Sequence, residues 1–534
     1  MIKKLLIALP LLTVFFSYGQ HRDQSRSIDV SHYTFSLAVN DSNNVLDAKA
    51  VISCKVFKKS TAISLDLIGL KPSGIGMVVS SAVINGLSVS FMQKDDKLVL
   101  SLSSAADTGQ FLEATVLYTG VPADGLIYSK NKYGHRTIFG DNWPNRARNW
   151  LVCIDDPADK AAVDFEITAP NHYQVVSNGI KTEETNLPGN LKYTRWTESV
   201  PLATEVMTVG IADFAVGYAG EAGCIPVYSW VFPEDREKGF LDYQEAKGIL
   251  SYFIDQVGPY PYHKLANVQS KTIFGGMENA SCIFYSEGSV SGKQQIGDLL
   301  AHEIAHQWFG NSVTETDFSN LWLSEGFATY MTNLYLEHKY GRDTLVKRLK
   351  VDRDSVISFC KRSERPIIDS SSNLMSLLNI NSYQKGGWVL HMLREKLGTQ
   401  VFWCCIRKYY ALYQGKNAST GDLETVMEEE SHVNLHGFFG QWLYRGGIPV
   451  LSAGWSYDEG KKEVIIKITQ EQNLPFEFPL EIGVYSLQQS SRVDDFLIKE
   501  KSGTYVIKLP YKPDHLVLDP QMKLLFDGTA RQIK

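Results

Sequence analysis

The 534-residue sequence is sparing in cysteine and contains no Cys-x-x-Cys pair. Its 7 cysteines are scattered and odd in number, which excludes a zinc ribbon and a dense disulfide framework and leaves one or two isolated disulfides open. Internal repeats, coiled-coil heptads and low-complexity tracts are also lacking. Basic charge is not in excess either, because the formal net charge is −6, and this balance argues against a nucleic-acid partner.

Long apolar runs are missing except at the N-terminus. A basic start is followed there by an apolar run over 5–16, which is too short to span a bilayer comfortably. Ser17 and Gly19 supply the small residues of a signal-peptidase site, so we predict a signal peptide over 1–19 and a mature chain beginning at Gln20. The alternative interpretation of residues 1–19 is an uncleaved membrane anchor. We therefore expect an exported protein, periplasmic or extracellular, without stable membrane insertion after cleavage.

The length exceeds what one hydrophobic core usually supports, so several domains are expected. Short alternating runs typical of half-buried strands occur at 33–39 and recur over the next eighty residues, at 61–69, 81–91, 96–103 and 111–118. From about residue 235 the pattern becomes helical, with stretches at 237–256, 293–309, 321–340, 343–361, 380–397, 399–413 and 420–445. After these helical stretches the alternating pattern typical of strands returns.

These patterns predict a multidomain α+β protein with an N-terminal β-saddle or sandwich, a mainly helical domain and a small C-terminal β-sandwich. We place the domains at 20–216, 217–446 and 447–534.

His302 and His306 form a His-Glu-x-x-His motif with Glu303 between them. Two histidines four residues apart on a helix lie about 40° apart around its axis, so both imidazoles can bind one zinc ion. Glu303 lies about 100° from His302, where it can reach a metal-bound water without being a ligand. Two satisfied surface histidines are the alternative interpretation, and the motif alone is informative rather than conclusive.

Glu325 is the candidate for the third ligand that a catalytic zinc site requires. It lies 19 positions after His306, in a second helical run rich in large apolar residues. A buried carboxylate is costly unless it binds a cation or is fully paired. An ordinary solvated glutamate is the alternative, and the histidine pair favours the ligand.

At this point the chain resembles a known family, the aminopeptidase N-type zinc aminopeptidases (gluzincins, peptidase family M-one), in a short form without their C-terminal helical domain. The resemblance rests on four segments in matching order: Gly275–Asn279, His302–Asn311, Trp322–Tyr330 and Tyr383–Leu393. It extends more weakly over Cys153–Lys160 and Phe438–Leu443, and so covers essentially the whole mature chain.

The resemblance implies a thermolysin-like catalytic domain with one Zn²⁺ per chain and an exopeptidase activity on peptides with a free N-terminus. Glu303 would be the general base, Tyr383 would stabilise the oxyanion, and Glu278 would bind the substrate's α-amine. The remaining substrate-binding residues implied by the Gly-Gly-Met-Glu-Asn string are Gly275, Gly276, Met277 and Asn279.

Two departures from the family pattern concern the region up to Cys153, and one of them is that Val152-Cys153 stands where many relatives have Pro-Cys. Many relatives have a glutamine there that helps bind the amine, but this chain has Asn142-Trp143-Pro144-Asn145, and the glutamine has no assigned counterpart. A thermolysin-like endopeptidase is the main alternative, and epoxide hydrolysis or a catalytically silent peptide-binding relative are weaker ones. The preferred N-terminal residue and the oligomeric state stay open.

Overall fold

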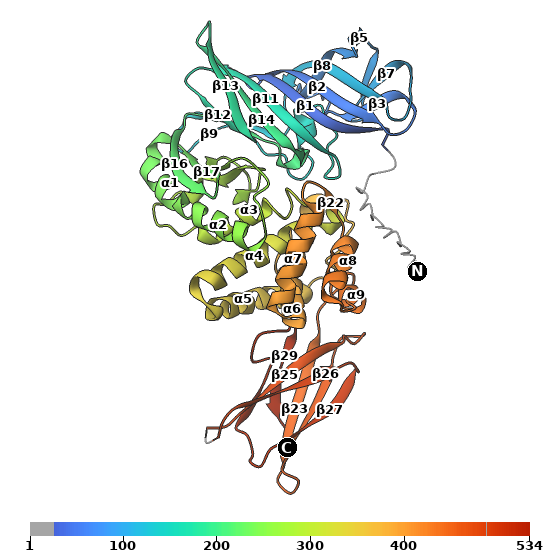
Figure 1. Ribbon diagram of the computed structural model, residues 1–534, viewed down its shortest axis with the longest axis vertical. Helices are drawn as coiled ribbons and strands as arrows, with labels where there is room; N and C mark the ends of the chain where they lie inside the picture. The colour runs from blue at the N-terminus through green and yellow to red at the C-terminus, as the bar shows by residue number, and fades with distance from the viewer. Residues whose placement is uncertain (1–25, 488, 534) are drawn as a thin grey trace, which may run out of the picture.

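The computed structural model describes residues 26–487 and 489–533, and it shows three regions stacked along one long axis (Figure 1). Strands β1 to β15 form the N-terminal region, β16 to α9 the middle region, and β23 to β29 the C-terminal region. This is the predicted α+β class with β structure at both ends. The predicted signal peptide, 1–19, lies outside the described residues. Within them, no helix is both long and apolar enough to cross a membrane.

The N-terminal region is built around an eight-stranded sheet with the order β13-β14-β11-β1-β2-β8-β4-β5. Its strands are β1 (Ile28–Ala38), β2 (Leu46–Val56), β4 (Gly76–Ile84), β5 (Leu87–Ser88), β8 (Phe111–Val121), β11 (Lys160–Pro170), β13 (Ile180–Leu187) and β14 (Leu191–Ala203). In β1 the apolar side chains of Tyr33, Phe35 and Leu37 are buried while their neighbours are partly exposed, which is the alternation expected of a sheet with one covered face.

Two smaller sheets complete this region. One contains β3 (Ser60–Asp66), β6 (Phe91–Lys94) and β7 (Lys97–Ala106), and the other contains β9 (Leu126–Lys130), β10 (Arg136–Gly140), β12 (Gln174–Ser177) and β15 (Val209–Ala212). The predicted single strand over 81–91 is wrong. Asn85 and Gly86 both have positive φ and form a tight turn between β4 and β5, as an Asn-Gly pair favours.

The described middle region contains nine α-helices: α1 (Arg236–Asp242), α2 (Ala246–Gln256), α3 (Gly297–His306), α4 (Trp322–Tyr340), α5 (Arg342–Cys360), α6 (Gly386–Leu397), α7 (Thr399–Tyr413), α8 (Thr420–Ser431) and α9 (His436–Leu443). The predicted helix over 420–445 is therefore two helices, which separate at His432 in the left-handed conformation. The predicted start at 293 is also wrong. The Asp242 carboxylate holds the backbone N–H groups of Ser291, Gly292 and Gln294 in a turn, so α3 begins later.

The middle region also contains a five-stranded sheet that the sequence patterns did not predict. Its order is β16-β17-β18-β20-β19, with β16 (Ala215–Ala222), β17 (Ile225–Val231), β18 (Leu265–Ser270), β20 (Cys282–Ser286) and β19 (Gly276–Met277). A short parallel pair, β21 (Thr314–Glu315) and β22 (Asn417–Ala418), lies apart from it. Strand β16 crosses the predicted domain limit at 216, and the division into domains stays a prediction.

The C-terminal region consists of a four-stranded and a three-stranded sheet. The first contains β27 (Ser502–Lys508), β24 (Glu463–Gln470), β23 (Val450–Asp458) and β29 (Asp527–Gln532), and the second contains β26 (Arg492–Ile498), β25 (Phe478–Tyr485) and β28 (His515–Leu518). Val464, Ile466 and Ile468 of β24 are buried between them. All seven cysteines are free thiols in the described part of the chain.

Buried lysines hold the first junction, which joins the N-terminal and middle regions. The Lys160 ammonium on β11 donates to the carbonyl oxygens of Asn311 and Ser312 at 3.0 and 2.8 Å. In the opposite direction, Lys264 donates to the Ser177 carbonyl at 2.7 Å. Because both lysines are almost fully buried, these bonds replace the hydration that each ammonium loses.

The second junction joins the middle and C-terminal regions through fewer buried contacts. His391 on α6 lies within 2.8 Å of the Met522 carbonyl through Nε2 and within 3.0 Å of the Tyr330 hydroxyl through Nδ1. Burial lowers the pKa of His391 to about 3, so the ring is neutral and bridges these two groups.

Candidate metal centre and active site

Helix α3 carries both histidines and buries its opposite face. Leu300, Ile304 and Trp308 repeat every four residues and are fully buried, so they anchor the helix as an amphipathic pattern requires. After His306 the chain turns, and Gly310 adopts a φ of +114°. A Cβ at Gly310 would lie 2.4 Å from the Ser324 hydroxyl, so only glycine allows the turn to approach α4 this closely.

His302, His306 and Glu325 converge on one point between α3 and α4. Their ligand atoms all lie within 4.8 Å of one another, and Glu325 Oε2 is 3.3 Å from Nε2 of each histidine. Glu325 Oε2 is buried and faces both imidazoles at a distance longer than an ordinary hydrogen bond. Two imidazole nitrogens and one carboxylate oxygen in this arrangement fit the three protein ligands of a catalytic metal site.

The orientation of the His306 ring leaves Nε2 directed at Glu325. On the other side of the ring, Nδ1 lies 3.2 Å from the Phe309 carbonyl and 3.0 Å from the Ser324 hydroxyl. A proton on Nδ1 satisfies the carbonyl and frees Nε2 as a ligand, which is the usual way that neighbouring groups set the tautomer of a metal-binding histidine.

The closeness of His306 and Glu325 shifts the pKa values of both groups. Burial tends to lower the pKa of His306, but the Glu325 and Glu278 carboxylates outweigh it and raise this pKa to about 10. Burial likewise tends to raise the pKa of Glu325, yet the two histidines lower it to about 2. The pocket thus holds a carboxylate that stays ionised and pairs with positive charge, which is the environment that a metal cation requires.

Glu303 and Glu278 are the two other buried carboxyl groups of the pocket. Burial, reinforced by nearby carboxylates, raises the pKa of Glu303 well above its ordinary value, and burial also raises the pKa of Glu278. Glycine at 276 is a steric requirement, because a Cβ there would lie 2.2 Å from Glu303 Oε1. A Cβ at Gly275 would meet nothing within 4 Å in the described structure.

The backbone of Glu278 is held by side chains that follow the histidine motif. Gln307 Nε2 and Asn311 Nδ2 both donate to the Glu278 carbonyl, at 2.8 and 2.7 Å. Gln307 Oε1 also accepts the backbone N–H of Ser281 at 2.8 Å. Gln307 and Asn311 have no role predictable from the motif pattern; in the structure they fix β19 and its following turn against α3.

Tyr383 enters the pocket from a π-helical turn, Asn381–Lys385, that precedes α6. Its ring stacks near that of His302, with centroids 6.0 Å apart and planes inclined by 14°. The turn packs directly on α4, since a Cβ at Gly326 would lie 3.0 Å from the backbone of Gly386. Burial and the Glu325 carboxylate raise the pKa of Tyr383 well above its ordinary value, so its hydroxyl keeps its proton.

These groups line one pocket of about 270 Å³, whose described lining is Trp143, Phe274, Gly275, Gly276, Met277, Glu278, Leu299, His302, Glu303, His306, Glu325, Leu378 and Tyr383. The structure thus brings together every residue singled out from the sequence except Asn279, which is fully buried beneath the pocket and does not line it.

The N-terminal region contributes Trp143 to the pocket wall, which the sequence analysis did not predict. The Trp143 ring packs edge-on against Phe274 and Phe318, with centroids 6.0 Å apart in both cases. Asp141, two residues earlier, accepts from Thr272 Oγ1 at 3.0 Å and from the Ile273 N–H at 3.1 Å. Asp141 therefore ties the N-terminal region to the segment that leads into Gly275 and Gly276.

Comparison with known proteins places this site in a family. Residues 242–442 match the peptidase family M1 domain, and residues 29–206 match the peptidase M1 N-terminal domain. The chain is 31% identical to aminopeptidase M1-C of Oryza sativa subsp. japonica over 68% of this chain and 44% of that protein. It is 26% identical to aminopeptidase M1 of Arabidopsis thaliana, over 86% of this chain and 56% of the relative.

Human glutamyl aminopeptidase is 29% identical, over 61% of this chain and 36% of its own length, so the chain spans about half the length of the curated relatives it matches, or less. A crystal structure of an M1 zinc metallopeptidase mutant from Deinococcus radiodurans, bound to a Tyr-Ser-Ala substrate, has the same fold, with a TM-score of 0.69 and 23% identity over 78% of this chain and 94% of that one. The two matched domains, the order of the regions and the shared fold lead to one conclusion: the chain belongs to peptidase family M1.

Proposed function

We propose that this protein is a zinc-dependent aminopeptidase that hydrolyses the first peptide bond of peptides with a free N-terminus. The observation that carries the proposal is the convergence of a His-His-Glu ligand set, two further buried carboxyl groups and a tyrosine on one small pocket. The names of the relatives, several of which are aminopeptidases, support the same conclusion.

In this proposal His302, His306 and Glu325 hold one Zn²⁺ per chain. Two imidazoles and one carboxylate are a ligand set typical of catalytic zinc. When bound, zinc polarises the scissile carbonyl and lowers the pKa of its water towards neutrality. The Ser324 hydroxyl and the Phe309 carbonyl orient His306 for this task.

Glu303 is the proposed general base. It is only 4% exposed, and burial makes its carboxyl group more basic than an ordinary glutamate, which suits a group that takes a proton from the attacking water and passes it to the leaving amine. Tyr383 keeps its proton and is proposed to donate its hydroxyl to the developing oxyanion.

Glu278 is the proposed anchor for the substrate's α-ammonium, which makes the reaction an exopeptidase one. Its backbone is fixed by Gln307 and Asn311, so the carboxylate is presented from a rigid turn. A peptide without a free amine would leave this carboxylate unpaired in a site with little solvent, which is costly. Gly275, Gly276 and Met277 would line the bound peptide, and the substrate contact of Asn279 stays a prediction.

The experiment that tests the proposal compares an aminoacyl fluorogenic amide with its N-acetylated form. Glu303→Gln should lower kcat by about 10² to 10⁴-fold while zinc content, measured by elemental analysis, stays at one per chain. Asp298→Asn on the same helix is the matched control, because Asp298 is exposed and does not line the pocket, and it should retain activity.

The acetylated substrate should be cleaved poorly by the wild type, and Glu278→Gln should raise KM for the free-amine substrate. Unchanged hydrolysis by Glu303→Gln would contradict the mechanism. Rapid cleavage of the acetylated substrate or of internal bonds would indicate a thermolysin-like endopeptidase instead.

We also infer export, on the basic, apolar and small-residue pattern of residues 1–19. Expression in a bacterial host followed by N-terminal sequencing of the periplasmic fraction should give a chain that starts at Gln20. An intact Met1 in the cytoplasmic fraction would contradict the inference.

A further inference from the structure

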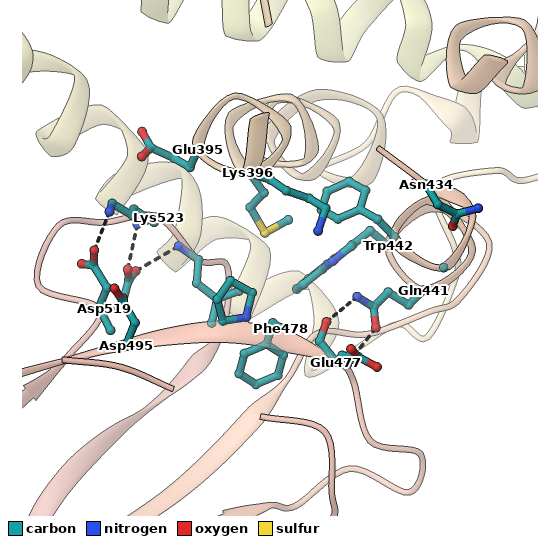
Figure 2. A pocket seen from close by; sticks show the side chains of 16 residues that line it. Glu395, Lys396, Asn434, Gln441, Trp442, Glu477, Phe478, Asp495, Asp519 and Lys523 are labelled. Atoms are coloured by element: carbon teal, nitrogen blue, oxygen red, sulfur yellow. Dashed lines mark hydrogen bonds and ion pairs between the residues drawn. The ribbon is translucent and has the colours of Figure 1, made fainter. Parts of the chain in front are cut away.

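A larger cavity lies at the second junction, away from the candidate active site (Figure 2). Its volume is about 770 Å³, within the range of pockets that hold small organic molecules or short peptides. None of the residues proposed for catalysis, metal binding or substrate binding lines it. Its walls come from the end of α6, from α9 and from the sheet of β25 and β26.

The cavity has an apolar part formed by side chains of both regions. Met392, Phe438 and Trp442 contribute from the helices, and Phe478, Pro479 and Leu524 contribute from the C-terminal region. Helix α9 also presents Gly437 to the cavity, where an added Cβ would meet nothing within 4 Å among the described atoms. The open space therefore continues to the helix backbone itself.

The lining holds two lysines, Lys396 and Lys523, and five acidic residues, Glu395, Glu477, Glu481, Asp495 and Asp519. Basic residues beside the cavity pair with three of the five: Arg342 with Glu395, Lys499 with Glu477 and Arg353 with Asp519. The acidic charge available to a ligand is therefore concentrated on Glu481 and Asp495, and it favours a cation over an anion.

Two of the carboxylates are opposed across neighbouring strands. Glu481 of β25 is the register partner of Asp495 of β26, so both side chains leave the same face of the sheet, towards the cavity. Like charges directly opposite one another are destabilising unless a cation lies between them. Lys523 supplies one such cation, through an ion pair with Glu481 Oε1 at 2.5 Å.

Lys523 does not satisfy both oxygens of the Glu481 carboxylate. The second oxygen of Glu481, Oε2, is buried, and it has no hydrogen-bond partner in the described parts of the chain, although the residue is only 6% exposed. The opposing Asp495 is exposed. An unpaired acceptor in a buried carboxylate is costly, and a further donor cation in the cavity would relieve that cost.

We propose that this cavity is a second peptide-binding site, which accepts a short segment with apolar and basic side chains. The aromatic and aliphatic wall provides apolar contact, and Phe438, which is partly exposed, is an aromatic partner for a guanidinium or ammonium group. The Glu481–Asp495 pair receives the basic side chain by charge-assisted hydrogen bonds. The site needs no free N-terminus, and so differs from the proposed active site in what it recognises.

The test measures binding to the full-length, zinc-loaded protein by isothermal titration calorimetry. The probe is an N-acetylated, C-amidated Phe-Arg-Phe-Arg tetrapeptide, whose blocked amine keeps it from the Glu278 subsite. The matched probe is Phe-Glu-Phe-Glu with the same blocked ends. We expect binding of the basic peptide and at least tenfold weaker binding of the acidic one.

Two variants locate the site. Gly437→Leu fills the cavity and should abolish binding, whereas Gly440→Leu on the same helix, which does not line the cavity and also has open space around its Cα, should not. Asp495→Asn removes one charge from an exposed position and should weaken binding of the basic peptide about tenfold. Circular dichroism and hydrolysis of an aminoacyl amide check that each variant is folded.

Three results would overturn the proposal: no binding of the basic peptide to the wild type, equal binding of the acidic peptide, or binding unaffected by Gly437→Leu. If Gly437→Leu fails to fold, the Asp495→Asn variant and the two probes decide the question alone. The proposal stands apart from the proposed function, because loss of hydrolysis in Glu303→Gln would leave the binding of the blocked peptide unchanged.

Discussion

The two junctions of the middle region differ in how they deal with buried charge. At the first junction, Lys160 and Lys264 reach across into the neighbouring region and end on backbone carbonyls. At the second, a neutral His391 makes the buried bridge, and the charged groups surround an open cavity. An interface without room for water needs every polar group paired, whereas a hollow one leaves groups free to bind a ligand. The first junction therefore builds the active-site wall, and the second offers a separate surface.

The largest expected effect comes from removing the charge that closes the first junction. Lys160→Met leaves the buried carbonyls of Asn311 and Ser312 without their donor. We expect a loss of about 2 to 5 kcal/mol in stability, because each buried acceptor left unpaired costs about 1 to 3 kcal/mol. The measurement is thermal unfolding, with the exposed Lys467→Met as the control. An unchanged melting temperature would show that the first junction does not depend on this contact.

A second prediction concerns the close packing of Gly276 against Glu303 in the active site, which lies beside the first junction. Gly276→Ala places a Cβ against Glu303 Oε1 and should displace the general base, with a fall in kcat of about 10²-fold. Gly248→Ala on α2, where nothing lies within 4 Å of the added atom in the described structure and which does not line the pocket, should leave kcat nearly unchanged. Equal effects of the two substitutions on kcat would refute the steric argument.

The third prediction addresses the bridge of the second junction and is smaller. His391→Phe removes the ring nitrogens that hydrogen-bond the Tyr330 hydroxyl and the Met522 carbonyl, at a cost of about 1 to 3 kcal/mol. Thermal unfolding measures the loss, and it should be less than that of Lys160→Met. A larger loss would reverse the comparison between the junctions.

The smallest effect is a pH dependence at the second junction. Burial raises the pKa of Asp519 to about 7, against an ordinary value of 3.8, so the folded protein binds a proton here that the unfolded chain releases between these values. The contribution of Asp519 to stability is therefore full below pH 4 and is lost as the pH rises through 7. The melting temperature of the wild type minus that of Asp519→Asn should be larger at pH 5 than at pH 8. A difference that is independent of pH would contradict the assignment.

The sequence predicted the parts of the fold that have a local signature. Helix α4 follows from its long run rich in apolar residues, and β1 follows from its alternation. Strand β18 escaped prediction because all six of its residues are buried, and a strand covered on both faces has no alternation to detect. The turn at Asn85 and Gly86 did have a signal, the Asn-Gly pair, which could have corrected the predicted strand over 81–91.

Prediction of the candidate active site was likewise limited to residues with a local sequence pattern. His302, His306 and Glu325 were found because short spacings on two helices encode them. Trp143 was not assigned a role, because it reaches the pocket only through the packing of the N-terminal region against the middle one. The one signal near it was the family resemblance, which implies a substrate-binding residue in the segment Asn142-Trp143-Pro144-Asn145 without identifying it.

The contact between Gly326 on α4 and Gly386 after the π-helical turn has a consequence for engineering. It clamps the segment that carries Glu325 to the segment that carries Tyr383, backbone against backbone, so the reactive groups move as one block. Trp143 belongs to no part of that block, since it arrives from another region. A library that varies position 143 and its surroundings can therefore search for new substrate preferences while the chemical machinery stays intact.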